Sequence, residues 1–121
     1  MNRFIKTLKL IPLILLISYS ASSQTSTFYV SSWNMENLFD GIDDPEKNDS
    51  DWLEGGTKDW SDERLALKIE NLAKVIKYMN ENNGPDLLGF QEVEHQYLID
   101  SLISIHLNNK NYSVVYAESP D

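Results

Sequence analysis

Two short strand-like runs, separated by a long amphipathic segment, constrain the fold of this chain more than any other feature. Residues 28–35 are rich in aromatic and β-branched side chains, and residues 87–90 are apolar throughout, as is typical of strands. A run that is apolar at successive positions favours a strand covered on both faces. Two strands joined by a helix favour a parallel β–α–β crossover, because parallel strands need a long connection. The sequence therefore predicts an α/β fold.

The segment between the two runs carries the signals of an amphipathic helix. Ser61 is a good N-cap, and two acidic residues follow it in the first turn, where negative charge is favoured. Glu70 and Lys74 form an exposed i,i+4 pair, and the run 82–85, Asn-Asn-Gly-Pro, ends the helix. Apolar residues recur at helical spacing and are expected to pack in the core: Leu65, Ile69, Leu72, Ile76 and Met79.

Two further elements are predicted after the second strand. Residues 94–107 are expected to form a helix that faces the core with Leu98, Leu102 and Ile105. Residues 112–117 are typical of a third strand. Together with the first elements, they predict helices packed on a small sheet.

Polar side chains follow both strands at the point where each strand ends. Asn34 and Glu36 would project to the same side if the first strand stays extended, while Trp33 would face the core. Gln91 and Glu92 directly follow the second run, and the carboxyl ends of parallel strands meet at one edge of a sheet. Their oxygen ligands suit Mg²⁺ or Ca²⁺ better than Zn²⁺, which prefers nitrogen and sulfur. Gln91 could orient Glu92 or a metal-bound water, or it could be a satisfied amide at a strand end.

The pairs Trp33-Asn34 and Gln91-Glu92, in this strand–helix–strand context, resemble the signature of the endonuclease/exonuclease/phosphatase superfamily, the DNase I-like metal-dependent phosphodiesterases. The resemblance implies that Glu92 is a principal metal ligand, that Asn34 supports the metal or the scissile phosphate, and that Glu36 can add an acidic ligand. It implies Mg²⁺ as cofactor, with Ca²⁺ or Mn²⁺ as alternatives. The implied function is an endonuclease-like phosphoester hydrolase that acts on a phosphodiester or phosphomonoester, with nucleic acid among the candidate substrates.

The later segments of this family, an Asp-x-Asn and a Ser-Asp-His that carries the catalytic His, do not occur in residues 24–121. We therefore interpret residues 24–121 as a partial domain, truncated at its carboxyl end. The resemblance implies that it forms the amino-terminal half of a four-layer α/β/β/α sandwich, and that this fragment is inactive by itself. The alternative is an exported binding module that keeps the half-fold without catalysis.

Charge and cysteine content narrow the function further. The chain has a net charge of −9 and no Cys. The acidic balance opposes non-specific binding to duplex DNA, which depends on a basic surface, and the lack of Cys excludes a disulfide framework within this chain. The carboxylates of the acid-rich loop, residues 41–59, could contact a metal or simply be solvated. Glu94 is expected to favour helix initiation, and His95 is left open for a metal or phosphate role.

Residues 1–23 have the pattern of a secretory signal peptide. A basic start with Arg3 and Lys6 precedes an apolar core at residues 8–19, and small residues follow at 20–23. The apolar core is shorter than the ~20 residues that span a bilayer, so stable membrane insertion is not expected. An uncleaved amino-terminal anchor is the alternative. The expected location is secreted or periplasmic.

We expect the exported protein to begin at or near Gln24, because signal-peptide cleavage follows small residues such as those at 20–23. Mass spectrometry of the exported product measures this start. A product that begins at Met1 or Asn2 would show that the leader is retained.

Overall fold

The computed structural model describes residues 25–118. In chain order it contains β1 (Val30–Leu38), the 3₁₀ turn η1 (Ser50–Trp52), α1 (Asp62–Asn82), β2 (Leu87–Val93) and α2 (Gln96–His106). The signal peptide expected at residues 1–23 lies outside the described residues. No helix within residues 25–118 is both long enough and apolar enough to cross a membrane.

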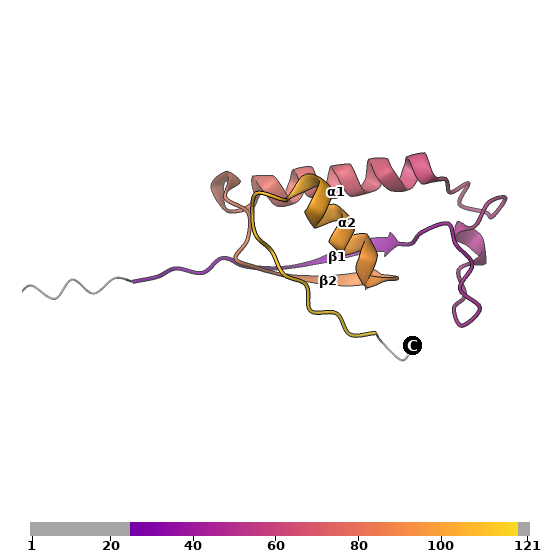
Figure 1. The fold of residues 1–121 in the computed structure, drawn as a ribbon, viewed down its shortest axis with the longest axis horizontal. Helices are drawn as coiled ribbons and strands as arrows, with labels where there is room; N and C mark the ends of the chain where they lie inside the picture. Colours follow the sequence, from indigo (N-terminus) through magenta and orange to yellow (C-terminus); the bar gives the residue numbers. More distant parts are fainter. Residues whose placement is uncertain (1–24, 119–121) are drawn as a thin grey trace, which may run out of the picture.

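The two strands form a parallel sheet, and α1 connects them. Val30 lies opposite Leu87, and Asn34 lies opposite Gln91. The predicted β–α–β unit and the α/β fold are therefore confirmed. Helices α1 and α2 lie over one face of this sheet (Figure 1). The expectation that the run 87–90 is covered on both faces is wrong for the described residues, since Leu87 is 63% exposed.

One hydrophobic core joins the sheet to the two helices. It is formed by Met35 and Leu38 of β1, Ile69, Leu72, Ala73 and Ile76 of α1, Leu98, Ile99 and Leu102 of α2, and Leu107. Trp33 is half-buried and packs against it. The predicted apolar face of α1 therefore supplies the core, and so do two of the three residues expected from α2. The two layers described here, helices on a sheet, leave the four-layer sandwich as a prediction.

Ile105 was expected to face inward, and this expectation is wrong. Its side chain is 67% exposed and borders an open groove together with Leu65 and Ile69 of α1. No further element of residues 25–118 covers this groove. Leu107, just beyond the end of α2, takes the buried position instead.

Helix α1 begins as expected and loses helical geometry before its last residues. The Ser61 hydroxyl accepts a hydrogen bond from the Arg64 amide at 3.4 Å, as an N-cap does. Met79 departs from helical dihedrals, and Asn80 adopts a left-handed conformation. The Asn80 side chain then donates to the Gly84 carbonyl at 3.1 Å. Met79, which was expected to extend the apolar face, therefore lies in the turn that leads to β2.

The third strand predicted at residues 112–117 does not form in the described structure. This segment is instead attached by side chains: the Tyr112 hydroxyl donates to the Pro85 carbonyl at 2.8 Å, and the Tyr116 hydroxyl donates to the Glu94 carbonyl at 2.7 Å. An alternating pattern predicts an extended backbone, but a strand also needs backbone hydrogen bonds to a neighbour. The prediction is wrong because residues 112–117 do not pair with β2 through a backbone ladder in the described structure.

Candidate active site

The predicted site residues meet at an irregular point of the sheet. Asn34 lies opposite Gln91, whereas Leu38 lies opposite Val93, so residues 35–37 face Glu92 alone. Glu36 has φ 53°, Asn37 has φ 60° and Glu92 has φ 57°, all in the left-handed region. Such a backbone costs roughly 1–3 kcal/mol for each residue that is not glycine, and it is concentrated at functional sites.

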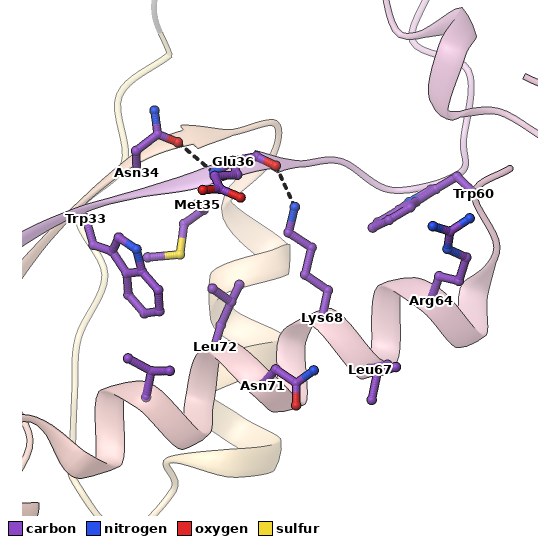
Figure 2. A pocket seen from close by; sticks show the side chains of 11 residues that line it. Trp33, Asn34, Met35, Glu36, Trp60, Arg64, Leu67, Lys68, Asn71 and Leu72 are labelled. Carbon is purple, nitrogen blue, oxygen red and sulfur yellow. Dashed lines mark hydrogen bonds between the residues drawn. The ribbon is translucent and has the colours of Figure 1, made fainter. Parts of the chain in front are cut away.

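Hydrogen bonds hold the Glu92 carboxylate on both sides. Asn34 Nδ2 donates to Glu92 Oε1 at 2.6 Å, and the Asn37 amide donates to Glu92 Oε2 at 3.1 Å. The remaining amide oxygen, Asn34 Oδ1, accepts from the Glu36 amide at 2.6 Å (Figure 2). The structure thus brings Asn34 and Glu92 into direct contact, and Asn34 acts as the group that orients Glu92. That Asn34 and Glu92 bind a metal ion stays a prediction.

The other two predicted residues are placed differently. Glu36 and Asn34 were expected on one side of a continuously extended strand, but the backbone turns at Glu36 and the strand alternation ends there. The exposed Glu36 lines a cavity beside β1. Gln91 Nε2 donates to Ser32 Oγ on the neighbouring strand at 2.9 Å. The orienting function of Gln91 toward Glu92 stays a prediction as well.

Lys68 of α1 stabilises the irregular segment, and the sequence carried no signal for this function. Its Nζ donates to the Glu36 carbonyl at 2.6 Å (Figure 2) and to the Asn37 carbonyl at 3.0 Å. Burial lowers the pKa of Lys68, and the carboxylates of Glu36 and Glu92 oppose that shift. Lys68 therefore places a positive charge under the backbone that presents Glu92.

A cavity of about 430 Å³ lies between β1 and α1, next to the Asn34–Glu92 contact. Figure 2 shows Trp33 on one side of it and Trp60 with Arg64 on the other. The Arg64 guanidinium lies 5.8 Å from the Trp60 ring, and Lys68 lies between the two tryptophans. Two cationic side chains beside aromatic rings can attract an anionic group to this cavity.

A second group of acidic side chains lies near the site. Asp40, Asp49 and Glu94 are all buried, and the Asp40 amide donates to Glu94 Oε2 at 2.9 Å. Burial raises the pKa of Glu94. Glu94 was expected to start the following helix, and this was wrong: α2 begins at Gln96 with His95 as its N-cap. The sequence carried a signal for this pair. Asp40 follows β1 and Glu94 follows β2, and the carboxyl ends of parallel strands meet at one edge of a sheet.

Comparison with known proteins places the chain in one family. A family model described as "Endonuclease/Exonuclease/phosphatase family" matches residues 29–121, a range that includes both strands and every predicted site residue. No curated protein and no solved structure gives a significant match.

Proposed function

This chain belongs to the endonuclease/exonuclease/phosphatase family, and we propose that it forms part of a divalent-metal-dependent phosphoester hydrolase. The narrower proposal is endonuclease-like cleavage of a phosphodiester. The observation that carries it is the contact between Asn34 and Glu92, formed by residues 58 apart in the sequence at a backbone with left-handed residues. A fold has little reason to hold an exposed carboxylate in this way unless the carboxylate has a function.

The donor set around Glu92 fits a hard divalent cation. Glu92 is exposed, and each of its carboxylate oxygens accepts one hydrogen bond from this chain. A carboxylate oxygen can accept about two hydrogen bonds, so both oxygens keep a lone pair for an ion. Mg²⁺ takes few protein carboxylates and keeps several waters, which suits one exposed carboxylate. Glu92 would hold the ion, and Glu36 is the one acidic residue within β1.

A bound divalent ion would polarise the phosphoryl oxygen and stabilise the charge on the leaving oxygen. Residues of this chain position the Glu92 carboxylate. Asn34 and the Asn37 amide fix both oxygens of Glu92, and Lys68 fixes the carbonyls of the same turn. Preorganised groups of this kind stabilise developing charge without reorganisation during the reaction. Arg64 and Lys68 at the cavity add the positive charge that draws a phosphoester toward it.

We expect the full-length protein to hydrolyse bis-p-nitrophenyl phosphate, a phosphodiester, in the presence of Mg²⁺, Mn²⁺ or Ca²⁺. Chelation with EDTA should abolish the activity and added metal should restore it, because the ion carries part of the charge stabilisation. Release of p-nitrophenol measures the rate, and nicking of supercoiled plasmid DNA tests the endonuclease proposal.

The substrate series separates the alternatives. Hydrolysis of p-nitrophenyl phosphate alone would support a phosphatase and contradict the endonuclease-like proposal. Absence of hydrolysis with every metal and both esters would contradict the enzyme proposal and favour the exported binding module. Export itself, through residues 1–23, is part of the same proposal and is tested by the start of the exported chain.

A further inference from the structure

Three donor side chains converge where β1 leads into the acidic loop and where β2 leads into α2. Carboxylate oxygens of Asp40 and Glu94 and a ring nitrogen of His95 all lie within 4.8 Å of one another. Donors that share one ion in a tetrahedral zinc site, each about 2.0–2.2 Å from the ion, lie about 3.3–3.6 Å from each other. The three side chains would therefore have to move closer together for all of them to bind one ion.

The electrostatic surroundings of this group lack a fixed cation. Asp40 is 5% exposed and Glu94 is 4% exposed, and burying a carboxylate is costly unless hydrogen bonds and a positive group compensate it. The Asp40 carboxylate accepts from the Ile42 amide at 2.6 Å and from the Tyr97 hydroxyl. Within residues 25–118, no Lys or Arg forms an ion pair with Asp40, Asp49 or Glu94. Burial and the nearby Asp40 and Asp49 carboxylates raise the pKa of Glu94, and His95 opposes that shift.

One oxygen of Glu94 has no hydrogen-bond partner within the described residues. Glu94 Oε2 accepts from the Asp40 amide, whereas Glu94 Oε1 is buried and has no hydrogen-bond partner among the described protein atoms. An ionised Oε1 would be a buried acceptor without a donor, and a protonated Oε1 would be a donor without an acceptor. Each state leaves an unsatisfied polar atom, which is rare in folded proteins.

We propose that Asp40, Glu94 and His95 bind a divalent transition-metal ion, with Zn²⁺ as the leading candidate, at a site separate from Glu92. Two carboxylates with one imidazole nitrogen suit Zn²⁺ or Mn²⁺, while Mg²⁺ and Ca²⁺ favour oxygen alone. The ion would satisfy Glu94 Oε1 and compensate the buried carboxylates. It would also tie the start of the acidic loop to the corner between β2 and α2. This site goes beyond the proposed hydrolase function and does not depend on it.

Calorimetric titration of the full-length protein with Zn²⁺ tests the site. His95→Ala should weaken Zn²⁺ binding at least ~10-fold, because even groups that only orient a metal ligand are worth that much. His95 makes no side-chain capping hydrogen bond, so its removal should leave α2 intact. His106→Ala, at the carboxyl end of the same helix, is the matched control and should bind Zn²⁺ as the wild type does. Glu92→Gln should also retain Zn²⁺ binding.

A second measurement keeps the proposal testable if a variant folds poorly. In the wild-type protein, one equivalent of Zn²⁺ should shift the ring-nitrogen NMR signals of His95 and leave those of His106 in place. Equal Zn²⁺ affinity of the His95→Ala and His106→Ala proteins, or an unchanged His95 spectrum, would overturn the proposal. Loss of all Zn²⁺ binding in Glu92→Gln would overturn it too, since the ion would then belong to the Asn34–Glu92 site.

Discussion

Replacing Glu92 by Gln in the full-length protein should lower metal-dependent phosphoester hydrolysis at least ~10²-fold, the loss expected when a major electrostatic element of a site is removed. Gln keeps the size of the side chain and removes its charge. The hydrogen bonds from Asn34 and Asn37 both end on the Glu92 carboxylate, so the geometry is built for an anion there. Initial rates measured over a range of Mg²⁺ concentrations give the change in kcat and in the apparent metal affinity.

Two companion variants show whether the effect belongs to the site. Glu70→Gln removes the same charge from the exposed face of α1, where Glu70 pairs with Lys74 at 2.7 Å, and it should leave the rate unchanged. Asn34→Ala removes a group that orients Glu92 and should cost roughly 10–100-fold, as orienting partners of metal ligands do. A Glu92→Gln enzyme with wild-type turnover at limiting Mg²⁺ would show that the ligand assignment is wrong.

Leu102→Ala should destabilise the fold by about 2–5 kcal/mol, the range for removing a buried leucine side chain. Leu102 is 0% exposed and belongs to the core that joins α2 to α1 and the sheet. Removing three carbons from that position loses burial and leaves a cavity that the neighbours fill only in part. Urea unfolding of the full-length protein, followed by circular dichroism, measures the change in the free energy of unfolding.

Ile105→Ala is the matched control for Leu102→Ala. It removes an aliphatic side chain of the same size from the same helix, but Ile105 is 67% exposed. Its effect should stay within about 0.5 kcal/mol, as for most surface substitutions. Equal destabilisation by the two variants would mean that the groove beside Ile105 is covered in the full-length protein.

Local sequence signals were sufficient where the determining interactions are local. The Ser61 cap, the apolar spacing of α1 and the strand-like runs act over a few residues, and each of these elements forms. Helical spacing predicts which residues share a face of a helix. It does not predict what covers that face, so the Ile105 prediction failed, or where the helical geometry ends, so the Met79 prediction failed. The prediction of a strand at residues 112–117 failed for a related reason, since an alternating sequence pattern does not show whether a neighbouring strand is there to accept its backbone hydrogen bonds.

The sequence by itself determined the β–α–β order, the core face of α1 and the meeting of Asn34 with Glu92, because parallel strands bring their carboxyl ends to one edge. Only the tertiary structure decided how these groups are used. The left-handed turn at Glu36 is held by Lys68, which is 32 residues away, and the buried Glu94 accepts a hydrogen bond from the Asp40 amide, 54 residues away. Such contacts arise from packing between distant segments, and no periodicity or spacing within either segment encodes them.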